Sequence, residues 1–340
     1  MSEAPLLAVT MGEPAGIGPE IALKAHLALA GRPAAPRLLW LADPDLAAAT
    51  AKRLGIGAQL LVVRSADEAR RADGRALAIL PHLLARASEP GRPDPANAPA
   101  VVAAIETGVA LLARGAADAL VTNPIAKSVL AAAGFAYSGH TEFLAALAQR
   151  HFALAEEPTP VMMLAGPRLR TVPLTLHLPL SEVPAALTEE RILEVARIVA
   201  RSLAGEFGIA RPRLVLGGLN PHAGEDGRLG TEEERVLRPA AQKARAEGID
   251  LKGPLAADSL FHEGARGGYD AALLPSHDQA LIPVKTLDFE DTVNVTLGLP
   301  FVRTSPDHGT AFDIAGTGRA SERGLLAAIA LAERLAARRR

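Results

Sequence analysis

Three histidines lie at or just beyond the ends of short apolar segments. His177, His222 and His277 share this position although they are far apart in the sequence. In an open parallel sheet, ligands bind at the carboxyl ends of the strands, so side chains from distant segments can converge there. Three neutral imidazoles that leave coordination positions open are typical of a catalytic divalent-metal site. Each histidine taken alone is better explained as an ordinary loop residue, so the metal-site hypothesis depends on the shared position.

Two further groups of polar residues suit the binding of a phosphoester. His140 and Thr141 precede a helical segment, where Thr141 is the expected N-cap and free backbone amides attract phosphate or carboxylate. The other group consists of Lys285, Asn294 and Arg303. Lysine supplies a point charge and arginine a forked donor for phosphate oxygens. Ordinary capping and a solvated surface are the alternative interpretations.

Strand-like and helix-like segments alternate along the chain and must position these residues. The predicted strands are residues 6–10, 37–42, 76–80, 119–122, 161–164, 174–178, 214–217, 271–274 and 301–304. The predicted helices are residues 98–114, 141–152, 188–207, 231–247 and 320–339. This alternation predicts an α/β fold with a largely parallel sheet. Several strands are apolar with little alternation, as expected when both faces of the sheet are covered.

Composition excludes several classes of protein. The chain has 340 residues, a formal net charge of −2 and no cysteine. The balanced charge provides no footprint for nucleic acid, and the lack of cysteine excludes disulfides, thiolate nucleophiles and iron–sulfur clusters. Glycine, proline and charged residues interrupt the apolar stretches, so we expect none to reach the ~20 residues of a membrane helix. The N-terminus lacks the pattern of a signal peptide. These features favour a cytoplasmic protein with neither a membrane nor a nucleic-acid partner.

A glycine-rich segment, residues 11–20 (MGEPAGIGPE), follows the first predicted strand. It matches neither the dinucleotide fingerprint G-x-G-x-x-G nor the P-loop, and its proline and glutamate argue against a simple phosphate cradle. The signatures G-x-S-x-G and H-E-x-x-H are also absent from the sequence. A standard Rossmann dinucleotide site is therefore not expected.

Six sequence motifs together resemble the 4-hydroxythreonine-4-phosphate dehydrogenase family. They occur in the family's order and extend from residue 10 to about residue 318. The motifs are TMGEPAGIGPE (10–20), TNPIAK (122–127), GHTE (139–142), NPHAGE (220–225), HDQ (277–279) and VNVTLGLPFVRTSPDHGT (293–310).

The resemblance implies a metal-requiring dehydrogenase of pyridoxal 5′-phosphate biosynthesis. The cofactor would be NAD, with NADP as the alternative, and the divalent metal would be zinc, magnesium or cobalt. The C3 hydroxyl of 4-phosphohydroxy-L-threonine would be oxidised to the ketone of 2-amino-3-oxo-4-phosphooxybutanoate. This β-keto acid would lose carbon dioxide to give 3-amino-2-oxopropyl phosphate.

The resemblance also assigns residues to roles. His177, His222 and His277 would bind the metal, the third ligand coming from the partner subunit of a homodimer. The residues that would bind the phosphorylated substrate are His140, Thr141, Lys285, Asn294, Arg303 and Asp258. The loop 308–316 (HGTAFDIAG) would bind the dinucleotide through His308, Gly309, Thr310 and Asp313. The proton of the hydroxyl group would pass to Lys285, to Asp258 or to metal-bound water.

The implied fold resembles that of isocitrate and isopropylmalate dehydrogenases, with two interleaved α/β subdomains flanking a cleft. The first would contain approximately residues 1–130 and 295–340, and the second approximately residues 131–294. Ser276 is a departure, because the family usually has tyrosine before the HDQ motif.

Three other functions remain open. A sister dehydrogenase would act on 4-phospho-threonate, 4-phospho-erythronate or a cis-dihydrodiol. A three-histidine metal hydrolase would need no dinucleotide. A catalytically silent phosphate-binding or regulatory protein would bind without turnover.

Overall fold

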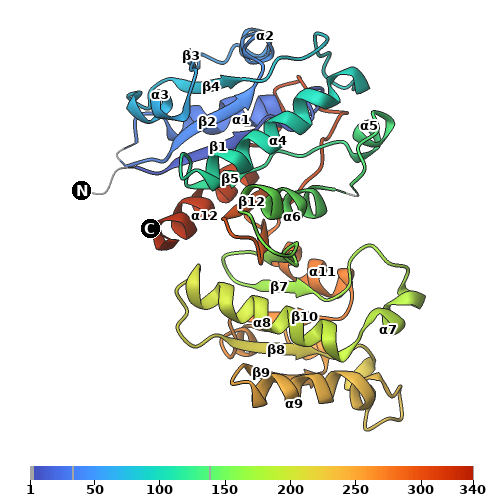
Figure 1. Cartoon of the computed structure of the whole chain (residues 1–340). Helices are drawn as coiled ribbons and strands as arrows, with labels where there is room; N and C mark the ends of the chain where they lie inside the picture. The colour runs from blue at the N-terminus through green and yellow to red at the C-terminus, as the bar shows by residue number, and fades with distance from the viewer. Residues whose placement is uncertain (1–3, 33, 138, 340) are drawn as a thin grey trace. The chain divides into compact units, whose positions relative to one another are not determined.

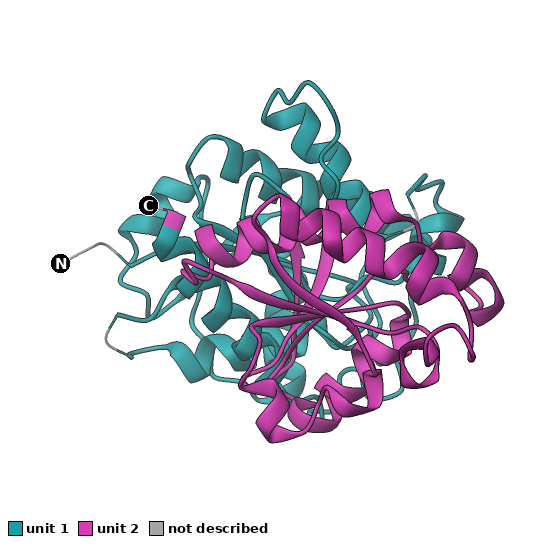
Figure 2. Cartoon of the chain, turned by 90° about the horizontal axis from the view of Figure 1, so that it is seen from below, with its two compact units in different colours: residues 1–160, 299–338, 340 teal, residues 161–298, 339 magenta. Residues whose placement is uncertain are grey.

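The computed structural model describes residues 4–32, 34–137 and 139–339 (Figure 1). The chain divides into two compact units, each built of strands and helices (Figure 2). Unit 1 contains residues 1–160, 299–338 and 340, and unit 2 contains residues 161–298 and 339. The expected α/β class is confirmed.

All strand pairs within the sheet of unit 1 are parallel. The strand order is β3 (Leu60–Val62), β4 (Leu77–Pro81), β2 (Arg37–Ala42), β1 (Leu6–Thr10), β5 (Ala119–Val121) and β12 (Arg303–Pro306). The helices of unit 1 are α1 (Gly18–Leu29), α2 (Pro44–Leu54), α3 (Ala66–Arg71), α4 (Ala98–Ala113), α5 (Lys127–Ala132), α6 (His140–His151) and α12 (Arg323–Arg339), with a 3-10 turn η1 (Pro95–Asn97). Every residue of β1 is buried, which explains its unbroken apolar sequence.

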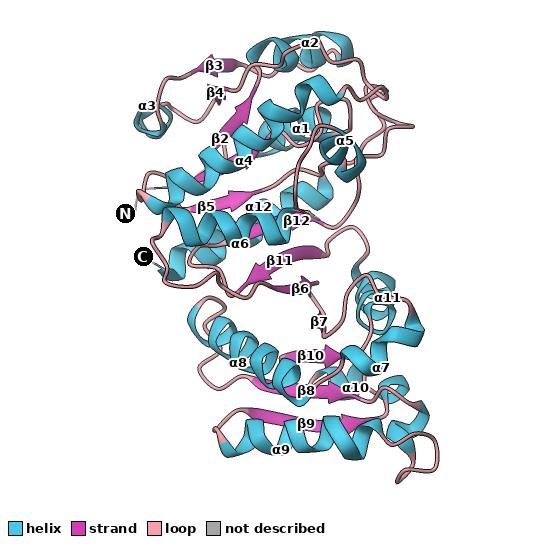
Figure 3. Cartoon of the chain, turned by 45° about the vertical axis from the view of Figure 1, so that its right-hand side comes forward, coloured by secondary structure: helices cyan, strands magenta, loops and turns pink. Residues whose placement is uncertain are grey.

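Unit 2 has a mixed sheet, in which β6 is antiparallel to both of its neighbours (Figure 3). The strand order is β11 (Val293–Leu297), β6 (Val161–Ala165), β7 (Arg170–Pro173), β10 (Ala271–Leu274), β8 (Arg213–Gly217) and β9 (Asp250–Leu255). The helices are α7 (Val183–Ala186), α8 (Glu189–Gly205), α9 (Arg238–Ala246), α10 (Glu263–Arg266) and α11 (His277–Asp288). Four single turns complete the unit: η2 (Leu180–Glu182), η3 (Pro221–Gly224), the π-helical η4 (Glu233–Leu237) and η5 (Ala257–Ser259). The strands β7, β10, β8 and β9 are parallel, so their carboxyl ends lie on one edge.

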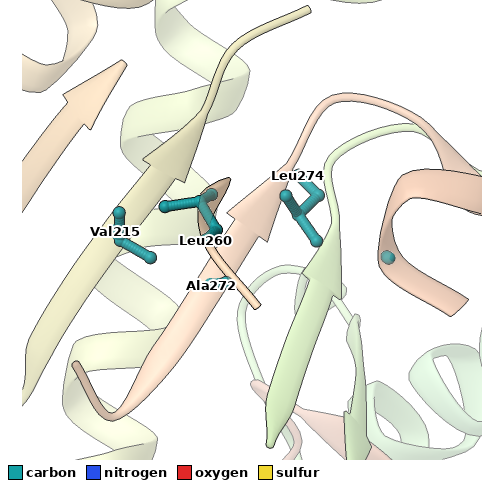
Figure 4. Packing of buried hydrophobic residues seen from close by; sticks show 5 residues of the cluster. Val215, Leu260, Ala272 and Leu274 are labelled. Atoms are coloured by element: carbon teal, nitrogen blue, oxygen red, sulfur yellow. The ribbon is translucent and has the colours of Figure 1, made fainter. Parts of the chain in front are cut away.

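A buried apolar cluster holds that edge of unit 2 together (Figure 4). Its members are Val215 on β8, Ala272 and Leu274 on β10, Leu260 after η5 and Ala280 on α11. All five side chains are at most 3% exposed. The cluster therefore fixes the segments that carry His277 and Asp258 to the sheet.

Several sequence-based boundaries differ from the structure. The strand expected at 174–178 is β7, Arg170–Pro173, because Thr171 pairs with both β6 and β10. The helix expected at 231–247 begins as a π-helical turn and continues as α9. Residues 131–160, expected in the second subdomain, belong to unit 1, since α6 packs on α4.

One stretch among the described residues, Pro95–Ala113, is long and apolar enough by composition to cross a membrane. The expectation that no stretch reaches this length was therefore wrong. A little over half of this stretch, 56%, is buried inside the protein. Helix α4 packs on β1, β2 and β5, and this packing accounts for its apolar composition.

Candidate functional site

Two of the three candidate metal ligands lie together. His177 follows β7 and His277 follows β10, and these strands are parallel neighbours. Their ring centroids are 5.7 Å apart. Two imidazoles that bind one ion at about 2.0–2.1 Å place their centroids roughly 5 Å apart, so the pair fits a shared cation after a small rotation of either ring. The expected convergence at the strand ends therefore holds for this pair.

His277 is oriented by the residue that follows it. Its Nδ1 lies 2.8 Å from Asp278 Oδ1. A carboxylate that accepts the Nδ1 proton fixes the tautomer in which Nε2 keeps its lone pair, and this arrangement is the usual support of a metal-binding histidine. The donor set therefore fits a divalent cation of the zinc or cobalt type, for which imidazole is a suitable ligand.

Ser276, which replaces the usual tyrosine, caps helix α11. It is 6% exposed, and its backbone amide and its hydroxyl both donate to Gln279 Oε1 at 3.2 Å. Gln279 Nε2 donates in turn to the carbonyl of Gly218, at the end of β8. The serine thus starts the helix that carries His277, a role for which serine is among the preferred residues.

His222 is not grouped with the other two histidines. Among the described residues, no three His, Cys, Asp or Glu side chains lie close enough together to hold a metal ion. His222 follows β8 and is exposed, with a backbone φ of 52°. A single chain therefore brings together two of the three candidate ligands.

An open cavity of about 660 Å³ in unit 2 is lined by the two sequence neighbours of His277, Ser276 and Asp278. Its polar lining includes Asn220, Asp258, Ser276, Asp278 and Gln279. Its apolar lining includes Leu180, Val183, Phe261 and Ile282. The sequence-predicted Asp258 therefore faces the same space as the residues around His277. Of the other candidates in unit 2, Lys285 lies on α11 with its Nζ 5.9 Å from the Phe289 ring, and Asn294 lies on β11.

Unit 1 contains a group of three cationic or protonatable residues. Arg303 begins β12 and is 4% exposed. Its Nε and Nη2 donate to Thr122 Oγ1 at 3.2 and 2.6 Å, and burial lowers the pKa of the guanidinium to about 10. Lys127 begins α5 and lies so close to Gly139 that a Cβ there would be 3.1 Å from its Cε. The buried guanidinium of Arg303 is stabilised when an anion binds beside it.

His140 is the third member of this group and the first residue of α6. Its Nε2 is buried and has no hydrogen-bond partner among the described residues. Burial, together with the charges of Arg303 and Lys127, holds the pKa of His140 well below its usual range. The N-cap is Gly139 and not Thr141 as expected, because the helix already begins at His140. The amides of this helix start and the cationic side chains together make a candidate anion site.

The lowered pKa of His140 predicts a pH dependence of stability. Below about pH 6.5 the unfolded chain binds a proton at this residue and the folded chain does not, so unfolding becomes easier as the pH falls toward the lowered pKa. The loss is at most about 1.4 kcal/mol per pH unit. We expect urea denaturation from pH 7 to pH 5 to show a steeper loss for the wild type than for His140→Gln. The lowered pKa values of His26 and His82 affect both proteins equally and cancel. If the wild type and His140→Gln lost the same free energy of unfolding between pH 7 and pH 5, the lowered pKa of His140 would be contradicted.

The candidate cofactor loop, residues 307–322, is made of turns and coil and packs on the glycine-rich segment. The Ile17 amide donates to the Thr310 carbonyl at 3.0 Å. A Cβ at Gly16 would lie 2.9 Å from the same oxygen, so the close approach requires glycine. Glu13 is buried, and burial raises the pKa of its carboxyl. The glycine-rich segment therefore supports this loop through backbone contacts. His308, Gly309 and Asp313 are exposed on this loop.

Helix α1 fastens the far end of this loop through two residues that the sequence did not single out. Glu20, 1% exposed, accepts hydrogen bonds from the amides of Gly318 and Ala320. Lys24 donates to Glu20 Oε1 at 2.7 Å and to the carbonyls of the same two loop residues. Only the i,i+4 spacing of this Glu–Lys pair was visible in the sequence.

Comparison of the sequence with known protein families identifies the family of this chain. The family model of the pyridoxal phosphate biosynthetic protein PdxA matches residues 34–332. The chain belongs to this family. A PdxA-family relative from Methylorubrum populi, named 4-hydroxythreonine-4-phosphate dehydrogenase, is 56% identical over 98% of this chain and 95% of its own length.

Two solved structures support the same relationship. The 4-hydroxythreonine-4-phosphate dehydrogenase of Klebsiella pneumoniae matches with a TM-score of 0.87 and 35% identity, covering 98% of this chain and 99% of that chain. A terephthalate 1,2-cis-dihydrodiol dehydrogenase from Burkholderia xenovorans matches with a TM-score of 0.64 and 29% identity over 97% of each chain. The PdxA fold is thus shared by dehydrogenases named for two different substrates.

Proposed function

We propose that this protein oxidises 4-phosphohydroxy-L-threonine with NAD to 2-amino-3-oxo-4-phosphooxybutanoate, which decarboxylates to 3-amino-2-oxopropyl phosphate. The observation that carries the proposal is the anion site of unit 1, which suits a phosphorylated substrate. The names of the PdxA-family relatives support the same substrate.

The metal would be held by His177 and His277 of one subunit and by His222 of a second copy of the chain. Among the described residues His177 and His277 lie together and His222 is not grouped with them, so we assign the partner's contribution to His222 and not to His277, the last of the three in sequence. The all-imidazole donor set favours zinc or cobalt over magnesium, which prefers oxygen ligands. When bound, the cation would act as a Lewis acid toward an oxygen of the substrate. His277 contributes by holding Nε2 in its acceptor form through the contact with Asp278.

Unit 1 would hold the phosphate group and the dinucleotide. Arg303, Lys127 and the start of α6 supply the cationic contacts for the phosphate. The loop that carries His308, Gly309, Thr310 and Asp313 would bind NAD, with NADP as the alternative, and the nicotinamide would accept the hydride. Remote contacts of this kind fix the reacting carbon, where a small displacement is costly.

Unit 2 would supply the proton acceptor. Asp258 lines the cavity that Ser276 and Asp278 also line, and Lys285 lies on the same helix as His277. Either side chain would take the proton of the C3 hydroxyl as the hydride leaves. Placing an acceptor within reach of that proton is the first requirement of general base catalysis.

The proposal is tested by following NADH absorbance with purified protein, NAD and 4-phosphohydroxy-L-threonine, before and after treatment with a chelator. We expect metal-dependent formation of NADH with release of carbon dioxide, and lower activity after chelation that zinc or cobalt restores. Activity only with 4-phospho-threonate or 4-phospho-erythronate would move the protein to a sister reaction. Turnover without NAD would indicate a hydrolase, and no turnover with any of these compounds would indicate a binding protein.

The cis-dihydrodiol alternative has support of its own from the Burkholderia xenovorans structure. The dihydrodiol of terephthalate carries carboxylates of two oxygens each, whereas a phosphate group offers three acceptor oxygens to a cationic group such as Arg303 and Lys127. The buried Arg303 therefore suits either anion, and the names of the relatives with higher identity favour the phosphorylated substrate.

A further inference from the structure

The turn that carries His222 has an unusual backbone. Six consecutive residues, 222–227, have positive φ: 52° for His222, 52° for Ala223, 80° for Gly224, 44° for Glu225, 53° for Asp226 and 82° for Gly227. Four of them are not glycine, and the left-handed region is unfavourable for L-residues with a Cβ. A run of this kind persists only where its surroundings hold it, and such strain concentrates at functional sites.

The contact that holds this turn is the carboxylate of Glu233. This side chain is fully buried, at 0% exposure. Its Oε1 accepts hydrogen bonds from the amides of Leu219 and Asn220 at 2.8 and 2.7 Å, and its Oε2 accepts one from Asn220 Nδ2 at 2.9 Å. A Cβ at Gly224 would lie 2.7 Å from Oε2, so the carboxylate packs directly against the turn. Glu233 therefore connects the entry of the turn with its middle.

Residues 230–237, which follow the turn, hold the Glu233 carboxylate in this position. Glu233 begins the π-helical turn η4, which ends at the buried Leu237. The preceding Glu232 accepts from Asn220 Nδ2 at 2.8 Å, so Asn220 is shared by two carboxylates. A Cβ at Gly230 would lie 2.3 Å from the same Nδ2, and glycine there lets the amide approach. A buried carboxylate is costly unless its oxygens are satisfied, and here three donors satisfy them.

We infer that Glu233 is a positioning residue that holds His222 in the orientation needed to bind the metal of a second copy of the chain. The inference rests on the proposed function, in which His222 is a ligand. A single histidine offered to another subunit gains no support from neighbouring ligands in its own chain. The left-handed turn and the buried carboxylate behind it supply that support, as supporting hydrogen bonds do at other metal sites.

The test uses the full-length protein and Zn²⁺, whose affinity is measured by competition with a chelating dye. Glu233→Gln keeps the shape and the Oε1 acceptor but replaces Oε2 with an amide NH2, a donor that cannot accept from Asn220 Nδ2. We expect it to bind Zn²⁺ roughly 10- to 100-fold more weakly than the wild type. Glu234→Gln, the same change at the next and exposed residue, is the matched control and should leave affinity unchanged.

A second variant and a second readout separate positioning from folding. Asn220→Ala keeps the buried carboxylate and removes one of its donors, and we expect it to weaken Zn²⁺ binding several-fold with an unchanged melting temperature. In the metal-free protein, hydrogen exchange at the amides of Leu219 and Asn220 should accelerate in Glu233→Gln and not in Glu234→Gln.

His222→Ala distinguishes failure of this inference from failure of the proposed function. If His222→Ala binds Zn²⁺ as tightly as the wild type, the proposed ligand set is wrong. If His222→Ala weakens binding and both Glu233→Gln and Asn220→Ala match Glu234→Gln, the ligand set stands and the positioning role is overturned. If Glu233→Gln does not fold, wild-type affinity in Asn220→Ala overturns the inference.

Discussion

Replacing His277 with alanine is expected to lower kcat/KM at least ~1,000-fold without unfolding the protein. A divalent cation contributes several kcal/mol of transition-state stabilisation, and each 1.4 kcal/mol corresponds to about tenfold in rate. The fold should survive, because His277 is only half-buried and the cap of α11 is made by Ser276 and Gln279. The measurements are kcat/KM, metal content by mass spectrometry and the melting temperature.

Asp278→Asn is the comparison variant for this prediction, with a smaller expected effect. Asparagine keeps an oxygen that can accept the Nδ1 proton, but it lacks the negative charge that makes the imidazole a stronger ligand. We expect metal affinity to fall roughly 10- to 100-fold, a smaller effect than that of His277→Ala. Normal metal content and activity in His277→Ala would remove this histidine from the ligand set. Equal losses in both variants would instead indicate that Asp278 binds the metal directly.

The sequence predicted correctly those strands that are determined by the residues within the strand itself. Residues 6–10, 37–42 and 271–274 were predicted as strands with their observed bounds, because each is a short, almost unbroken apolar run that is buried. Strand β7 was displaced in the prediction because its polar first residues, Arg170 and Thr171, become strand through pairing with β6 and β10. Pairing partners that are distant in the sequence carry no local signal.

The same distinction applies to the candidate site. The pairing of His177 with His277 was predictable, since both follow strands and strand ends of a parallel sheet meet at one edge. Glu20 and Glu233 were not predictable as buried residues. The donors of Glu20 lie about 300 positions away, at Gly318 and Ala320. Those of Glu233 belong to Leu219 and Asn220, on the far side of the left-handed turn 222–227. Buried acids of this kind look like surface residues in a sequence.

Replacing Arg303 with methionine is expected to lower kcat/KM for the phosphorylated substrate by about 1,000-fold. The charge-assisted contacts of an arginine with phosphate contribute more than neutral hydrogen bonds, and lysine does not reproduce their forked geometry. Arg303→Lys should therefore recover only part of the activity. An exposed arginine of the same unit, Arg114, provides the control, and Arg114→Met should leave kcat/KM unchanged.

In the ligand-free protein, by contrast, Arg303→Met should cause little or no loss of stability. Arg303 is buried near Lys127 and His140, and burial already lowers the pKa of its guanidinium to about 10. Methionine removes that buried charge at similar volume, so the free energy of unfolding should change by less than about 1 kcal/mol or increase. Inorganic phosphate should raise the melting temperature of the wild type and not that of the variant, since a ligand at 100 times its Kd stabilises by about 2.7 kcal/mol.

These two readouts separate a binding role from a structural role. Replacing a residue that stabilises the core lowers the free energy of unfolding with or without phosphate. Replacing a residue that only binds an anion removes only the extra stability that the bound anion gives the protein. If ligand-free Arg303→Met were less stable by about 3 kcal/mol or more and phosphate stabilised both proteins equally, its bonds to Thr122 would be structural. In that case the phosphate site would have to be sought elsewhere, because His140 and Lys127 would lose the cation that completes their group.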